Sequence, residues 1–262
     1  MQDIKLWMEN SYLKLNDQKT QFTVFYPTSN YSLLRPLELK FRDDDESLTI
    51  SNELKILGIK LTPALNFESF ISKKVQGCYF HLKNFSNIRK SLPIAMRITL
   101  VTTMILSRLD YCNSVLVGTT AKDIKPMERI LNKSVRFIFD IRKREHITPY
   151  LFKLHFLPIR WRIDFKICLL AFKIKQKISP DYLTNTFQNF EPTTSISLRP
   201  GSGRDRDMLE SFSILMSNRS LFCKLVEKWN ELPLQIRQLQ SITHFKTQLK
   251  THYFKLAFHK LV

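Results

Sequence analysis

Glycine is scarce in this sequence, which has 5 glycines among 262 residues, well below the usual share of about 7%. So low a content argues against an all-β sandwich rich in tight turns and against glycine-rich loops that bind nucleotide phosphates. No uninterrupted apolar run approaches about 18 residues, which argues against a transmembrane helix, and no signal peptide is visible. We therefore expect an intracellular protein, cytoplasmic or nuclear.

Cysteine and histidine do not form a metal-binding pattern. The smallest gap between cysteines is 34 residues, and no CxxC or Cys/His knuckle spacing occurs. This argues against a zinc site and, at this length, against a disulfide scaffold. His146 and His155 have no neighbouring ligand set, so we expect core or capping roles for them. The sequence predicts no metal and no cofactor in this chain, and a reducing compartment.

The chain does have an excess of positive charge, and it is concentrated in the middle third. The formal net charge is +18, from 41 Lys and Arg against 23 Asp and Glu. It divides into −2 for residues 1–70, +16 for residues 71–178 and +4 for residues 179–262. A concentrated field of one sign is typical of a protein that binds a polyanion. Nucleic acid is the first candidate, an anionic membrane the second, and an ordinary solvated basic face the alternative.

The apolar pattern predicts a mainly α protein with a small N-terminal α+β portion. Thr148 and Pro149 are typical of an N-cap and a first helical residue. Residues 191–207 are poor in apolar residues and predict a linker. The other expected elements are helices at 2–15, 75–85, 94–109, 123–141, 161–176, 212–229 and 241–259, strands at 22–26 and 54–61, and a hairpin of residues 37–41 and 47–50 with an acidic tip.

Residues 123–141 have the strongest two-faced pattern. With Ile124 at zero and about 100° per residue, four apolar residues fall within about 60° of it and four cations between about 100° and 180°. The apolar residues are Met127, Leu131, Val135 and Ile138, and the cations are Lys125, Arg129, Lys133 and Arg136. Cations at this spacing can follow a phosphate backbone. The basic face continues beyond the helix through Arg142, Lys143 and Arg144.

The helix expected before it also carries two cations on one side. Arg97 and Arg108 are eleven residues apart, which places them about 20° off register in a regular helix. We therefore expect them to share a face.

One acidic stretch formally matches a polymerase motif. Phe41-Arg42-Asp43-Asp44 has the order aromatic-x-Asp-Asp, but two-metal chemistry needs another Asp from a separate strand. The residues before it supply no acid at the end of an apolar strand, and its flank, Asp45-Glu46-Ser47, is typical of a loop. We interpret it as a solvated acidic turn and expect no catalytic residue in this chain.

Five short strings follow one another along the chain. They are Ser107-Arg108-Leu109-Asp110-Tyr111-Cys112-Asn113-Ser114; His146-Ile147-Thr148-Pro149 with Leu154-His155-Phe156-Leu157-Pro158 and Arg162-Ile163-Asp164-Phe165-Lys166; Ser179-Pro180-Asp181-Tyr182-Leu183; Trp229-Asn230-Glu231-Leu232-Pro233; and Phe245-Lys246-Thr247-Gln248-Leu249-Lys250. In this order they resemble the C-terminal part of LINE-type (non-LTR) retrotransposon reverse transcriptases, of the jockey-like and chicken-repeat-like groups. Phe156 departs from the family, which usually has Trp there, and Leu198-Arg199-Pro200 follows it only loosely.

The start of the chain resembles the palm segment that follows the catalytic hairpin in this family. The matching residues are Trp7-Met8-Glu9-Asn10, Leu13-Lys14-Leu15-Asn16 and Lys19-Thr20, and Leu57-Gly58-Ile59 resembles the primer-grip turn. The resemblance implies a palm-end remnant (1–66), a basic helical thumb-like domain (67–178) and a C-terminal helical region (179–262). It also implies that the catalytic aspartates, and the Mg²⁺ of the full-length polymerase, lie outside this chain, which would not polymerise alone.

A thumb of this family grips the template–primer by its backbone, so the resemblance implies an RNA–DNA or RNA template–primer as partner. No small-molecule substrate and no membrane are expected. Leu57 and Gly58 would position the primer end by close backbone approach. We expect phosphate contacts first from Lys125, Arg129, Lys133, Arg136, Arg142, Lys143 and Arg144, and second from Arg97, Arg108, Arg160, Arg162 and Lys166.

Other interpretations stay open at this point. The chain could be a partial gene model of an active reverse transcriptase, or an inert or co-opted protein with an interaction role. Binding to a membrane surface is weaker, because the basic helices carry no exposed Trp or Phe stripe beyond what the core needs.

Overall fold

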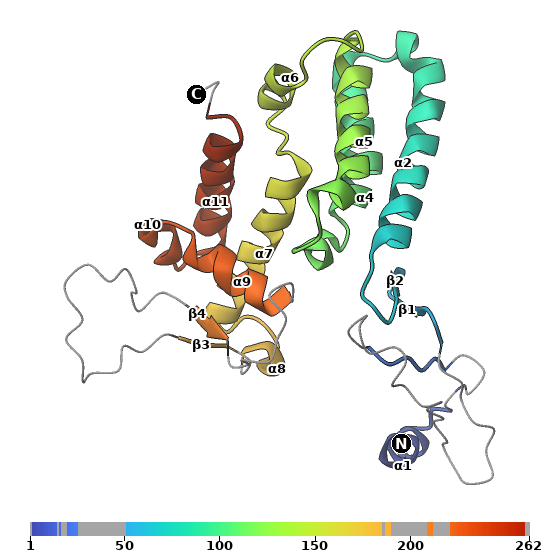
Figure 1. Ribbon diagram of the computed structural model, residues 1–262, viewed down its shortest axis with the longest axis vertical. Coiled ribbons are helices and arrows are strands. Elements are labelled where there is room, and N and C mark those ends of the chain that lie inside the picture. Colours follow the sequence, from blue (N-terminus) through green and yellow to red (C-terminus); the bar gives the residue numbers. More distant parts are fainter. Residues whose placement is uncertain are drawn as a thin grey trace. The chain divides into compact units, whose positions relative to one another are not determined.

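The computed structural model describes residues 2–14, 16, 20–25, 51–184, 187–189, 209–211 and 221–259 (Figure 1). It confirms a mainly α fold with small antiparallel sheets. The packing divides the chain into two compact units, Met1–Ser72 and Lys73–Val262. The hairpin expected at 37–41 and 47–50, with its acidic tip, and the linker expected at 191–207 lie outside the described residues.

The described residues of the first unit are mostly exposed or half-buried. Helix α1 (Gln2–Asn10) is shorter than the helix expected at 2–15, and Trp7 on it is 64% exposed. The strand expected at 22–26 is reduced, among the described residues, to a bridge at Phe22, whose carbonyl accepts a hydrogen bond from Ser51 N–H at 2.7 Å. Among the described apolar residues of this unit, only Phe70 and Ile71 are buried.

Residues 54–61 form a hairpin, and the prediction of one strand there was wrong. Strand β1 (Leu54–Ile56) pairs antiparallel with β2 (Ile59–Leu61). Leu57 and Gly58 form the turn with φ of +48° and +82°. A two-residue turn with two positive φ angles matches the twist of the paired strands, and Gly58 adopts this conformation at no steric cost. Leu57 and Gly58 thus form a turn, and their primer-grip role stays a prediction.

Helix α2 (Glu68–Ile88) spans the boundary between the units and is followed by the 3₁₀ turn η3 (Arg89–Ser91). The expected helix from residue 94 is present as α3 (Ile94–Leu100), the π-helical segment η4 (Val101–Leu106) and α4 (Ser107–Asp110). Val101, Ile105 and Leu109 are fully buried, whereas Ile94 at the start of α3 is 51% exposed.

Helices α5 (Ala121–Phe139) and α7 (Ile159–Lys175) lie close to the ranges expected for them and pack against each other. Between them, α6 (Thr148–Lys153) has Ile147 as its N-cap, so the prediction of Thr148 as the cap was wrong by one residue. The 3₁₀ turn η5 (Asn113–Leu116) also packs on α7. Helix α7 is therefore the element shared by both halves of the second unit (Figure 1).

Three C-terminal helices also pack on α7: α8 (Asp181–Thr184), α9 (Leu221–Asn230) and α11 (Ile242–Ala257). The short helix α10 (Leu234–Arg237) packs on α11, and the pair β3 (Phe187–Asn189) and β4 (Leu209–Ser211) comes before α9. Phe245 of α11 stacks on Phe172 of α7 with ring centroids 4.2 Å apart, and on Trp229 at 5.8 Å. Residues 179–262 thus belong to the same compact unit as residues 73–178.

We expect the amides of β1 and β2 to exchange with deuterium much faster than those of α5 and α7. A two-stranded hairpin is marginal by itself in water, whereas α5 and α7 are packed through fully buried residues such as Val135 and Ile167. Hydrogen exchange followed by mass spectrometry measures this order directly, and greater protection of the hairpin would contradict the analysis.

Candidate nucleic-acid interface

Helix α5 separates apolar and charged side chains as its sequence predicts. The five apolar residues expected on its inner face are at most 4% exposed; they are Ile124, Met127, Leu131, Val135 and Ile138. On the other face, Lys125, Arg129 and Lys133 are exposed and Arg136 is half-buried. The helix therefore carries the predicted cations on its surface and buries the predicted core stripe.

Local interactions determine where α5 begins and ends. Thr120 and Asp123 form a capping box, in which the Thr120 hydroxyl accepts from Asp123 N–H and the Asp123 carboxylate accepts from Thr120 N–H, both at 3.3 Å. At the other end, Asp140 has a left-handed φ of +59°, which turns the chain out of the helix. The loop that follows α5 thus starts at a defined residue; we refer to it as the basic loop because it carries Arg142, Lys143 and Arg144.

Arg136 holds the loop that follows α5. Its guanidinium donates to the carbonyl oxygens of Arg142 (3.4 Å), Lys143 (3.0 Å) and Glu145 (3.0 Å). Glu145 in turn accepts from the Arg142 N–H at 3.0 Å and from the Tyr150 hydroxyl at 3.2 Å. The side chains of residues 142–144 remain exposed. We conclude that Arg136 positions the basic loop.

A cleft of about 960 Å³, open to solvent, lies between α2 and α5; we refer to it as the α2–α5 cleft. Within the described part of the chain, six cations and no carboxylate line it. This is a cleft of one charge sign, which concentrates the electrostatic field that attracts an anion. The six are Lys83 and Arg89 from α2 and η3, and Arg129, Lys133, Arg136 and Lys143 from α5 and the loop.

The lining between these cations is apolar and partly aromatic. Leu82, Phe137 and Ile141 contribute to it, and Phe137 packs near Phe85 with centroids 6.2 Å apart. Tyr79 of α2 is half-buried in the lining, and the Lys133 ammonium lies 4.7 Å from the centre of its ring. The cleft therefore has charged and apolar surface side by side.

Arg89 connects the two sides of the α2–α5 cleft. It forms an ion pair with the exposed carboxylate of Asp140 at the end of α5. Burial lowers the pKa of Arg89, and the nearby positive charge of Arg97 lowers it further. The Nε atom of Arg89 is buried, and it has no hydrogen-bond partner among the residues that the structure describes. Arg89 thus lies at the edge of the cleft with one carboxylate partner, Asp140, and a second cation, Arg97, nearby.

Sequence reasoning did not find Lys83 and Arg89. The apolar stripe that predicts this helix includes Tyr79, and Lys83 and Asn87 follow Tyr79 at a spacing of four residues. That spacing places them on one face, and this face of α2 lines the cleft. The spacing of these residues is visible in the sequence, but no local feature shows that this face of α2 lies opposite the cations of α5.

Arg97 and Arg162, from the second group of expected phosphate contacts, instead form hydrogen bonds that hold the fold together. Arg97 is half-buried and donates to the carbonyl oxygens of Leu92 at 2.8 Å and Ile138 at 3.1 Å, so that it joins α3 to the end of α5. The π-helical segment η4 lies between Arg97 and Arg108. Because its turns are wider than α-helical ones, the angle that predicted a shared face does not apply across it. Arg108 is exposed.

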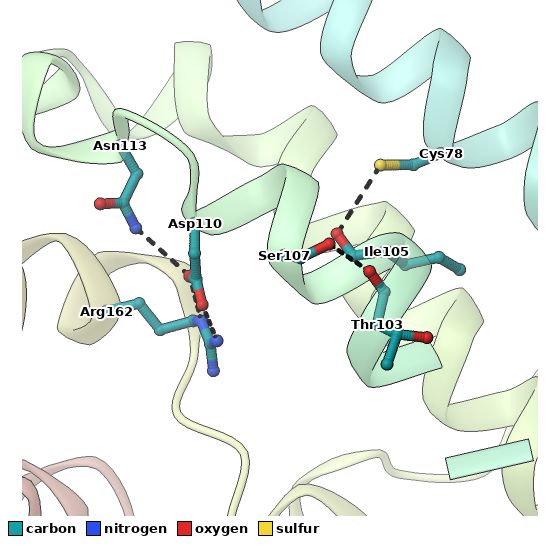
Figure 2. A network of polar contacts seen from close by, with 7 residues as sticks. All are labelled: Cys78, Thr103, Ile105, Ser107, Asp110, Asn113 and Arg162. Carbon is teal, nitrogen blue, oxygen red and sulfur yellow. Dashed lines mark hydrogen bonds and ion pairs between the residues drawn. The ribbon is translucent and has the colours of Figure 1, made fainter. Parts of the chain in front are cut away.

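Arg162 is the other arginine with a structural partner. Figure 2 shows its guanidinium directed at Asp110, with Nε 2.8 Å from Oδ1 and the second nitrogen on Oδ2. The buried side chain of Asn113 donates to the same Oδ1 at 3.4 Å. A bidentate ion pair of this kind joins α4 to α7 across 52 residues. Arg160 and Lys166 on α7 are exposed.

The residues predicted to contact phosphate therefore fall into three groups, and Arg136 belongs to two of them. Four lie together in the α2–α5 cleft: Arg129, Lys133, Arg136 and Lys143. Three donate to protein groups: Arg97, Arg136 and Arg162. Six are exposed and do not line the cleft: Lys125, Arg142, Arg144, Arg108, Arg160 and Lys166.

Comparisons of this chain with protein-family models, curated proteins and solved structures give no match. No group of three His, Cys, Asp or Glu side chains in the described ranges could hold a metal ion. None of the helices that the structure describes is both long and apolar enough to cross a membrane. The geometry and charge of the described residues are thus the grounds for a functional proposal.

A buried carboxylate lies beside the exposed Arg160. Asp164 of α7 is 5% exposed, in a small cavity lined also by Lys224, Glu227 and Lys228 of α9. Burial raises the pKa of Asp164, and the charges of Lys228 and Arg160 oppose this effect without cancelling it. The folded protein therefore retains the proton to higher pH than the unfolded chain does.

Replacing Arg136 by Gln should loosen the basic loop. Because hydrogen bonds from a partly exposed charged group contribute about 1 kcal/mol, trypsin should cut after residues 142–144 about fivefold faster in Arg136→Gln than in the wild type. Mass spectrometry of the fragments measures the rate. Lys125→Gln, which also removes a charge from α5, is the matched control, and equal rates in both variants would contradict the role of Arg136.

The buried carboxylate predicts a pH dependence of stability. Above the ordinary Asp pKa the unfolded chain loses the proton that folded Asp164 keeps, so the free energy of unfolding should fall as the pH rises through this range. Asp164→Asn cannot titrate, so its stability relative to the wild type should increase as the pH rises above about 4, the ordinary Asp pKa. Urea unfolding at several pH values measures this. A stability difference between Asp164→Asn and the wild type that does not change with pH would contradict it.

Proposed function

We propose that this chain binds nucleic acid through its phosphate backbone, using the cations of α5, of the following loop and of the α2–α5 cleft. One observation carries the proposal: six cations and no carboxylate line a cleft of about 960 Å³ among the described residues. Residues 71–178, which include this cleft, have a net charge of +16. A nucleic acid presents a regular row of phosphates, which is the anion that such an extended surface fits.

Several exposed cations are available to bind phosphates. Lys125, Arg129 and Lys143 have exposed side chains, and no carboxylate of the described residues lies within ion-pair distance of them. Each neutralised phosphate releases counterions, so the logarithm of the affinity should fall by about 0.7–0.9 per contact for each unit of log salt. Binding of this kind does not depend on base sequence.

Within this function, we propose the role of a reverse transcriptase thumb of the LINE type, which grips a template–primer. The five ordered strings support it, together with a mainly helical basic unit and the turn at Leu57 and Gly58. In this role the chain contributes binding and positioning, and no catalytic residue is assigned to it.

Charge reversal on α5 tests the proposal. In fluorescence anisotropy with a labelled RNA–DNA duplex, the double variant Lys125→Glu/Arg129→Glu should bind at least tenfold more weakly than the wild type, with a salt slope smaller by about 2, since about one unit is lost per phosphate contact. The matched control is Lys246→Glu/Lys250→Glu, an exposed pair at the same spacing on α11. Circular dichroism verifies that both variants fold.

Two results would contradict the proposal. Absence of binding by the folded wild-type chain at low salt would show that the basic surface is only solvated. Equal losses in the α5 and α11 variants would show that net charge, rather than the surface of α5, determines the affinity.

A further inference from the structure

We infer that the α2–α5 cleft binds an unpaired strand of nucleic acid, with phosphates on its cationic sides and a base against Tyr79 and the apolar lining. This inference rests on the proposed nucleic-acid binding and specifies the form of strand that the cleft takes. It also gives α2, through Lys83 and Tyr79, a part in binding that neither the charge pattern of α5 nor the resemblance assigned.

Some cations of the cleft form hydrogen bonds or ion pairs within the protein, and the others remain available to a ligand. Arg136 donates to the loop and Arg89 pairs with Asp140. Lys83, Arg129 and Lys143 lie within the cleft lining, and no carboxylate of the described residues lies within ion-pair distance of them. They come from α2, α5 and the loop, so that a strand lying between the two helices would meet cations on both sides.

The apolar lining distinguishes a single strand from a duplex. A duplex turns its bases inward and presents phosphates, so it would contact the cationic rim and make no base contact with the half-buried Tyr79 and Ile141. An unpaired strand exposes its bases, which stack on aromatic side chains while the backbone follows a basic groove. The α2–α5 cleft combines both surfaces in one place.

The shape of the cleft favours a polymer over a free nucleotide. Small-molecule sites of about 300–1,000 Å³ enclose most of their ligand, whereas this cleft has a volume at the upper end of that range and is open to solvent. Along α2 the lining extends from Tyr79 to Asn87, a rise of roughly 12 Å at 1.5 Å per residue. A strand with a charge about every 3.4 Å or more can place a few phosphates along this length.

Binding of matched strands tests the inference. Fluorescence anisotropy is measured on the full chain with a labelled oligo(dT) of about 16 nucleotides, the upper site size of a single-strand module, and with a labelled RNA–DNA duplex of equal length. The single strand should bind the wild type more tightly. Tyr79→Leu should weaken single-strand binding roughly 5- to 150-fold, the range for loss of one stacked base, and should leave duplex binding within twofold.

Each variant has a control on the same helix. Phe80→Leu changes the neighbouring aromatic residue, which is 63% exposed and outside the cleft lining. Lys83→Glu should weaken single-strand binding and reduce its salt slope by about 0.7, whereas Lys73→Glu, an exposed cation outside the lining, should change neither. Circular dichroism confirms folding of all four.

The outcomes separate this inference from the proposed function. Selective loss of single-strand binding in Tyr79→Leu and Lys83→Glu supports it. Equal behaviour of cleft and control variants, or equal loss of duplex and single-strand binding, overturns it and leaves nucleic-acid binding standing. Competition by poly-glutamate as strong as by unlabelled oligo(dT), at equal charge concentration, also overturns it. Absence of binding to either nucleic acid overturns the proposed function and the inference together.

Discussion

The second unit depends on helix α5, which must bury one face completely while the opposite face stays charged. Burial of a large apolar side chain contributes about 1.5–3 kcal/mol, and five such residues of α5 are at most 4% exposed. Repulsion between cations one turn apart costs only about 0.2–0.5 kcal/mol per pair. Core packing therefore exceeds the repulsion several-fold and holds Lys125, Arg129 and Lys133 together on the surface. The cleft beside α2 exists because α5 is fixed in this orientation.

The Lys and Arg residues of 71–178 include two kinds, which differ in whether the side chain binds another part of the protein. Arginines with several donors at fixed angles hold the chain to itself, as Arg97 does at the end of α5, Arg136 at the loop and Arg162 on Asp110. Exposed cations such as Lys83 and Arg129 have no such role among the described contacts. Both kinds contribute to the field of the surface, but only the second is available to form short contacts with a ligand.

The residues that carry the resemblance are largely packing residues. Asp110 and Arg162, from two different strings, form the ion pair between α4 and α7. Trp229 and Phe245, from the last two strings, are fully buried and stacked on each other. The cations of α5, of residues 142–144 and of the α2–α5 cleft lie outside these strings, whereas Arg108, Arg162 and Lys166 lie within them. The strings therefore contribute packing contacts, whereas the surface proposed to bind phosphate is identified by its charge and exposure.

The sequence by itself determined the helices with an unbroken apolar period, such as α5, α7 and α11, because that period is a local property. It did not determine the hairpin at 54–61, which depends on two positive φ angles at Leu57 and Gly58. Only the tertiary structure decided which cations are available and that α2 forms the second side of the cleft. The reason is that the role of a cation depends on the carbonyl or carboxylate within about 3 Å of it, and for Arg97 and Arg162 that group lies 41 and 52 residues away in the chain.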